Sequence, residues 1–195
     1  MIMDGNLQKM KIDYSISMTK ANLYSIIFVL PVIFLGWIYY RIWGIEKIVE
    51  TIQFIKTKYG VLFAVILLLL GIVIHELIHG YSWRAFSNKP KETIKFGINW
   101  KALSPYAHCT EPMNVVPYRL GCVMPAIVVG VLPYLAGLFS GNSALTLFGL
   151  FFIFAASGDF LILWSLRKVK HGNLVEDHPT NAGCFVYEKN SQSVD

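Results

Sequence analysis

Two histidines four residues apart enclose a glutamate within a strongly apolar stretch of the chain. The stretch reads GIVIHELIHG over residues 71–80, so His75, Glu76 and His79 form the pattern HExxH. Positions four apart lie on one face of a helix, so both imidazoles can bind one metal ion. Glu76, one step round the helix, can then reach a water molecule on that ion and act as general base. The pattern predicts a Zn²⁺ site with hydrolytic chemistry.

The apolar surroundings favour a metal site over an accidental match. Ionisable side chains inside a membrane are costly unless they are paired, and neutral imidazoles that hold a divalent cation exchange this cost for coordination bonds. In the alternative interpretation the match is accidental and the histidines are only hydrogen-bonded. With the five histidines and seven glutamates of this chain, random composition would give about 0.005 such matches.

Asp159 is the preferred third ligand, since a catalytic zinc usually has three protein ligands and one open position. It is the only acidic residue in the last two apolar segments. Asp159 lies eight residues before Arg167, and Glu76 lies eight residues before Arg84. Both are therefore expected about 12 Å below the same membrane face. In the alternative, Asp159 pairs with Arg119 or a histidine for structural reasons. Small residues just before Asp159, Ser157 and Gly158, are expected to allow close helix approach.

Further candidate ligands or substrate contacts lie outside the apolar segments, and these are His108, Cys109, Glu111, Asp177 and His178. His108 and Cys109 precede the third segment, where they either dip into the site or remain solvated. His108 is also a candidate for stabilising a transition-state oxyanion. Asp177 and His178 lie about ten residues beyond the fourth segment, so they either fold back under the site or form a polar turn.

Four apolar segments are long enough to cross a bilayer. Hydrophobic residues make up 55% of the 195 residues, and charged residues make up 15%. Since about 20 helical residues span the hydrocarbon core, we expect spans near 21–40, 60–81, 119–139 and 145–166. The first 20 residues carry charges and lack the apolar core of a signal peptide, so the first span should remain in the mature protein. The sequence predicts one all-α multi-pass membrane domain over 1–195.

The basic residues indicate how the chain is oriented. With both termini inside, 13 of the 17 lysines and arginines fall on the cytoplasmic side. We therefore expect a protein of the cell membrane, with both termini and the tail 167–195 in the cytoplasm. This orientation accounts for the net charge of +5 better than binding to nucleic acid does. The three scattered cysteines argue against a disulfide framework.

The connecting segments have their own periods. Residues 44–59 repeat apolar side chains at helical spacing, which predicts an amphipathic helix that lies on the outer surface or packs on the spans. Residues 93–100 alternate apolar and polar side chains, which predicts a strand or short β-hairpin in the cytosolic loop between the second and third spans. This strand could hold an extended substrate by edge pairing, or act as a lid. Beyond Gly172 no period is evident, and we expect a loosely held tail.

At these residues the chain resembles the site-2 protease class of intramembrane zinc metalloproteases, and more closely a small membrane family of zincin peptidases. The matching pieces, in chain order, are HELIHG, AHCTEP, SGDFLIL and EDHP followed by GC. The resemblance implies that His75, His79 and Asp159 bind zinc and that Glu76 is the catalytic base. One departure is that Gly158 precedes the aspartate, whereas site-2 proteases carry the aspartate before a glycine.

The preferred function is an integral membrane zinc metallopeptidase that hydrolyses peptide bonds of membrane or membrane-proximal proteins. Its expected partners are a protein or peptide substrate and the lipid bilayer. One alternative is a non-catalytic zinc-binding membrane protein, in which the zinc is structural or a pseudoprotease binds transmembrane partners. A fourth ligand from His108 or Cys109 would favour that alternative. A metal transporter is the other, and it would need polar residues along a path to the outer face.

Overall fold

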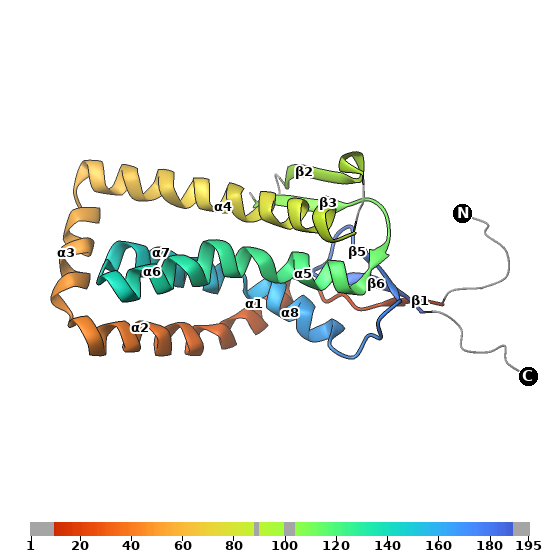
Figure 1. Cartoon of the computed structure of the whole chain (residues 1–195), viewed down its shortest axis with the longest axis horizontal. Coiled ribbons are helices and arrows are strands. Elements are labelled where there is room, and N and C mark those ends of the chain that lie inside the picture. Colours follow the sequence, from red (N-terminus) through yellow and green to blue (C-terminus); the bar gives the residue numbers. More distant parts are fainter. Residues whose placement is uncertain (1–9, 88–89, 100–103, 189–195) are drawn as a thin grey trace, which may run out of the picture.

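Long apolar helices run side by side, and two small sheets lie at one end of them (Figure 1). This computed structural model describes residues 10–87, 90–99 and 104–188. The helices are α1 Met18–Ser25, α2 Val29–Trp43, α3 Glu46–Ile55, α4 Lys58–Ser87, α5 Val115–Pro125, α6 Leu132–Ser140, α7 Ser143–Ala155 and α8 Ser157–Leu166. Short 3-10 turns cover Ile26–Phe28 and Lys91–Thr93, and a π-helix covers Ala126–Val131. The strands are β1 Met10–Asp13, β2 Ile94–Asn99, β3 Ser104–Cys109, β4 Met113–Asn114, β5 Leu174–Asp177 and β6 Cys184–Glu188.

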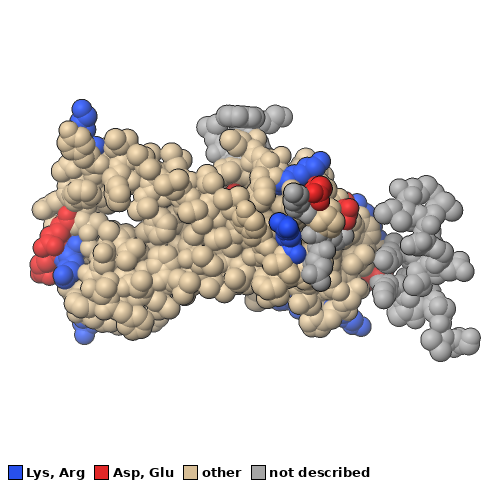
Figure 2. Space-filling view, turned by 45° about the horizontal axis from the view of Figure 1, so that its top comes forward, with Lys and Arg blue, Asp and Glu red and all other residues tan. Residues whose placement is uncertain are grey.

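Three of the four predicted spans are continuous helical segments of sufficient length. They are Met18–Trp43, Lys58–Ser87 and Val115–Ser140. The fourth predicted span corresponds to α7 and α8, which reach this length only together and are bent by 42°, a geometry that fits either a broken span or a re-entrant loop. Figure 2 shows charged side chains gathered toward the two ends of the molecule, with a broad uncharged belt between them. This distribution fits helices whose middle sections are surrounded by lipid.

Helices α6 and α7 approach each other at backbone distance. The turn between them begins at Gly141, which ends α6 with a left-handed φ of 70°. The side chain of Asn142 then accepts a hydrogen bond from the Leu145 amide and caps α7. Farther along, a Cβ atom on Gly149 would lie 2.4 Å from the Tyr134 nitrogen and 2.7 Å from the Gly130 oxygen. Small residues therefore bring these helices together, as is common in membranes.

Replacing Gly149 with alanine should destabilise the protein by about 1–3 kcal/mol, because the obstructing atoms belong to the backbone and cannot move aside cheaply. Thermal unfolding in detergent measures the effect. Gly36→Ala in α2 is the matched control, since its Cβ would meet only Leu150 Cδ1 at an ordinary 3.6 Å. Equal unfolding temperatures for the two variants would contradict the close packing of α6 and α7.

The predicted helix in the first loop is confirmed as α3, which lies across the ends of α2 and α4 (Figure 1). The Thr51 and Ser143 hydroxyls are hydrogen-bonded at 2.5 Å, and Ser143 also donates to the Lys47 carbonyl at 2.7 Å. Helix α3 therefore packs on the start of α7. Its apolar side chains nevertheless include Val49 and Phe54, which are 41% and 53% exposed.

A hairpin connects the second and third apolar segments, as predicted. Strand β2 pairs antiparallel with β3, and Phe96 lies opposite Ala107. The end of the predicted strand, Trp100, lies outside the described residues.

The expectation of a loosely held tail was wrong, and the all-α description misses a second sheet. Within the tail, Leu174–Asp177 and Cys184–Glu188 form β5 and β6 in a four-stranded sheet with the order β1-β6-β5-β4, whereas residues 189–195 lie outside the described ranges. Strand β1, from the start of the chain, pairs with β6 so that Met10 lies opposite Glu188. These strands are only two to five residues long, too short for a convincing period, and their pairing is nonlocal. The first and last strands thus lie at the same end of the helices.

The principal hydrophobic core lies where this sheet meets α4, α5 and α8. Its buried members are Trp83, Cys109, Met113, Val115, Tyr118, Cys122, Leu166, Val169, Val175, Cys184 and Val186. All three cysteines are buried. The core attaches the sheet firmly to the helix ends that carry the candidate site.

Candidate metal centre

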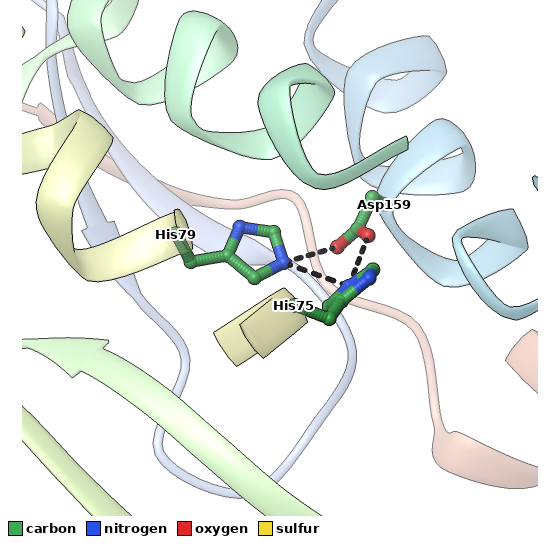
Figure 3. A group of neighbouring side chains, drawn as sticks. All are labelled: His75, His79 and Asp159. Atoms are coloured by element: carbon green, nitrogen blue, oxygen red, sulfur yellow. Dashed lines mark hydrogen bonds and ion pairs between the residues drawn. The ribbon is translucent and has the colours of Figure 1, made fainter. Parts of the chain in front are cut away.

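Two helices present the predicted ligands to one point. His75 and His79 lie one turn apart on the buried side of α4, and Asp159 lies in the first turn of α8. The break after α7 starts a new helix just before Asp159 and sets its direction. Figure 3 shows both imidazole rings and the carboxylate pointing toward one another from these two helices. The predicted meeting of the second and fourth spans is therefore present.

The distances within this group fit a tetrahedral zinc ion. His75 Nε2 lies 3.2 Å from His79 Nε2 and 3.2 Å from Asp159 Oδ2. His79 Nε2 lies 3.3 Å from Asp159 Oδ1. Ligand atoms about 2.0–2.1 Å from a tetrahedral zinc are separated from each other by about 3.3 Å. The two imidazole nitrogens therefore have the separation that a shared ion needs, and each also lies 3.2–3.3 Å from a different oxygen of the Asp159 carboxylate.

The second ring nitrogen of His79 fixes its tautomer. Nδ1 lies 3.0 Å from the Gly121 carbonyl of α5. A carbonyl only accepts hydrogen bonds, so Nδ1 carries a proton, and in the neutral ring the lone pair of Nε2 points into the group. Such an outer partner is typical of a metal-binding histidine. Gly121 makes this contact possible because a Cβ there would lie 2.1 Å from the Trp83 ring, so α5 approaches α4 closely.

Glu76 faces the hairpin from the same turn of α4. Its Oε2 accepts a hydrogen bond of 2.8 Å from the Ala107 amide of β3. The carboxylate also interacts electrostatically with the charges that His79, His75 and Asp159 can carry. A general base must lie within reach of the proton that it removes. Glu76 lies beside His75, His79 and Asp159, which we call the metal-compatible group.

The alternative pairing of Asp159 with Arg119 does not occur. Arg119 instead donates hydrogen bonds to the carbonyls of Leu166 and Val169, where it caps the end of α8. The expectation that Gly158 allows close helix approach was wrong, because a Cβ at that position would meet nothing within 4 Å. Asp159 therefore has the two histidines as its partners.

The loop candidates contact other groups. Cys109 Sγ donates to the Glu111 carbonyl at 3.2 Å, and His108 Nδ1 lies 3.4 Å from Asp177 Oδ2. Within the described ranges, the group of His, Cys, Asp and Glu donors able to share an ion comprises His75, His79 and Asp159. Neither His108 nor Cys109 joins it as a fourth ligand.

The two tail candidates have separate environments. Asp177 accepts hydrogen bonds from the Tyr118 hydroxyl at 2.6 Å and from the Cys109 amide at 3.1 Å. The His178 Nδ1 accepts hydrogen bonds from the two backbone amides that follow Pro179, at 3.1 and 2.9 Å. His178 thus forms the polar turn that was the alternative for this segment, whereas Asp177 joins three elements.

Hydrogen bonding to Asp177 raises the pKa of His108 above its ordinary value. The folded protein therefore holds the His108 proton more tightly than the unfolded chain does. The His108–Asp177 pair stabilises the fold fully below a pH of about 6.5, and this stabilisation is lost as the pH rises through the raised pKa of His108. Asp177→Asn should lower the pKa of His108, as measured by an NMR titration of its ring. Asp13→Asn is the control, since the Asp13 carboxylate accepts from the Ser15 amide. An unchanged midpoint in Asp177→Asn would contradict the pairing.

Sequence reasoning missed the supporting groups around the ligands. They are the Ala107 amide, the Tyr118 hydroxyl and the Gly121 carbonyl. The spacing of Tyr118 and Gly121, three residues apart, places them on one face of α5, and this was the available signal. Nothing in the local sequence indicated that a backbone amide of β3 would reach Glu76.

The comparisons with known proteins give one match. A family model described as "Putative zincin peptidase" covers residues 68–174, which are 107 of the 195 residues. The matched range includes Glu76 and all three members of the metal-compatible group, and it ends before Asp177. No curated protein and no solved structure matches the chain. Because the family model covers more than half of the chain, the protein belongs to this family of zincin peptidases.

Proposed function

We propose that this protein is an integral membrane zinc metallopeptidase that hydrolyses peptide bonds of membrane or membrane-proximal proteins. The observation that carries the proposal is the convergence of His75, His79 and Asp159 at distances of 3.2–3.3 Å, beside Glu76. Membership of the zincin peptidase family supports zinc chemistry. The long apolar helices support a place in the membrane.

The chemistry divides between the ion and the protein. His75, His79 and Asp159 would hold zinc, with a fourth position left for reactants. Bound zinc supplies Lewis acidity, which polarises a carbonyl group and makes water acidic enough to be deprotonated near neutral pH. Glu76 takes the proton of the attacking water on its carboxylate and returns it to the leaving amine. His79 keeps its Nε2 lone pair available because its Nδ1 proton is held by Gly121.

An extended peptide would bind along β3. The Ala107 amide points away from β2 and toward Glu76, so it lies on the strand edge nearest the metal-compatible group. A peptide carbonyl would take the Ala107 amide in place of Glu76, and backbone pairing at such an edge holds a peptide extended and exposes its amide bond. The sequence predicted that residues 93–100 would hold the substrate by edge pairing. Of these residues, Ile94–Asn99 form β2, which lies on the side of the hairpin away from Glu76. We therefore assign substrate pairing to β3, at the membrane face where most basic residues gather, which we take as cytoplasmic.

Zinc removal from the purified protein tests the proposal. The protein, reconstituted in liposomes, should contain one zinc ion and cleave members of a quenched fluorescent peptide library. A chelator should abolish cleavage and added zinc should restore it. Zinc-loaded protein that cleaves no peptide would favour the non-catalytic alternative and contradict the proposal. Zinc accumulation inside the liposomes would favour transport and contradict it equally.

A further inference from the structure

The outer edge of β3 is held by two carboxylates from different elements. The Ala107 amide donates to Glu76 of α4, and the Cys109 amide donates to Asp177 Oδ2 of β5 at 3.1 Å. Alternate residues of a strand direct their amides to the same edge. These two amides are therefore neighbouring donors on the edge that faces the metal-compatible group.

Asp177 is itself held from two other directions. Its Oδ1 accepts from the Tyr118 hydroxyl of α5 at 2.6 Å, and its Oδ2 lies 3.4 Å from His108 Nδ1. The side chain of Asp177 is only 13% exposed. Both carboxylate oxygens of Asp177 thus have protein partners. We call this arrangement, in which Asp177 links β3 to α5, the clamp.

The clamp is connected to a metal-binding histidine by stacked rings. Tyr118 stacks on Trp83 with ring centroids 5.7 Å apart, and Trp83 stacks on His79 at 5.4 Å. The Trp83 Nε1 also donates to the Tyr118 carbonyl at 3.2 Å. Strand β3 is therefore placed relative to α4 through Asp177 and a continuous, buried set of contacts.

We propose that Asp177 is a positioning residue, which holds β3 so that the Ala107 amide is presented beside Glu76 and the metal-compatible group. The inference rests on the proposed peptidase function and deepens it, because it makes the C-terminal strand β5 a support for the position of β3 beside Glu76. Asp177 lies beyond the segment that matches the zincin peptidase family. It acts through β3 and does not itself touch the reacting atoms.

Amide hydrogen exchange of the zinc-loaded protein in detergent tests the clamp without any substrate. Asp177→Ala should raise exchange of the Ala107 and Cys109 amides at least 10-fold, while α7 and the zinc content remain unchanged. Glu176→Gln is the matched control on the same strand, because Glu176 contacts Lys11 and Tyr187 instead, and it should leave β3 unchanged. Unchanged exchange in β3 of Asp177→Ala would overturn the proposal.

If Asp177→Ala loosens the whole fold, Tyr118→Phe tests whether Asp177 holds β3. It removes the 2.6 Å partner but keeps the Asp177 carboxylate, and it should raise exchange in β3 without affecting α7. Unchanged exchange of the Ala107 and Cys109 amides would overturn the proposal.

Cleavage of the peptide library provides the second measurement. Asp177→Ala should lower kcat/KM by about 100-fold at equal zinc content, because a small misplacement of bound substrate has effects of that size. Unchanged kcat/KM with a loosened β3 would overturn the positioning role. If the wild type cleaves no peptide, the peptidase function fails, while the exchange measurement still decides whether Asp177 clamps β3.

Discussion

Replacing Glu76 with glutamine should leave zinc bound and lower peptide cleavage by about 10²–10⁴-fold, the usual contribution of a general base. Glutamine has almost the same shape, and its amide oxygen can still accept the hydrogen bond from the Ala107 amide. It cannot take a proton from water. The effect should therefore appear in kcat, with little change in the zinc content measured by elemental analysis.

The control for this variant is Glu92→Gln, an exposed glutamate in the turn before β2. It makes the same chemical change outside the site and should cleave at the wild-type rate. Wild-type cleavage by Glu76→Gln would remove Glu76 as the base. Loss of zinc from the same variant would show that Glu76 supports the ion rather than the proton transfer.

Replacing Asp159 with asparagine should weaken zinc binding by at least about 100-fold and abolish cleavage with it. Loss of an outer hydrogen-bond partner of a metal ligand already costs about 10–100-fold in affinity, and we propose Asp159 as a direct ligand. The substitution keeps the size of the side chain but removes the negative charge that faces both histidines. Competition with a zinc-binding dye would measure the affinity.

Ser165→Ala is the matched control for Asp159→Asn. Ser165 lies on the same helix, and its hydroxyl donates back to the Ile162 carbonyl at 2.8 Å, so zinc binding should not change. Thermal unfolding of the zinc-free proteins separates ligand loss from disruption of α8. Unweakened zinc binding by Asp159→Asn would contradict the ligand set on which the proposed peptidase depends.

The break in the fourth apolar segment allows α7 and α8 to face different neighbours. One straight helix from Ser143 to Leu166 would impose a single direction on α7 and α8, whereas the two helices are bent by 42°. Helix α7 packs on α6 at backbone distance, while α8 directs Asp159 toward α4. The bend thus satisfies a packing requirement and a ligand requirement in neighbouring turns.

The candidate ligands and the helices that carry them could be predicted from the sequence because both signals are local. HExxH depends on the fixed spacing of one helix, and an apolar segment is recognised by its own length and composition. Asp159 could be identified because burial of a lone carboxylate in an apolar segment is energetically costly unless the carboxylate has a partner. The expectation of equal depth below one membrane face then linked Asp159 to His75 and His79, and the structure places these three side chains together.

The surroundings of the ligands were decided by tertiary structure alone. Strand β1 pairs with β6 from the other end of the chain, and Asp177 joins β5, α5 and β3. Neither contact has a local period, because each joins residues far apart in the sequence through one or a few hydrogen bonds. The chain's own order of residues thus indicated which side chains could share an ion, whereas only the packed fold decided which backbone edge lies beside them.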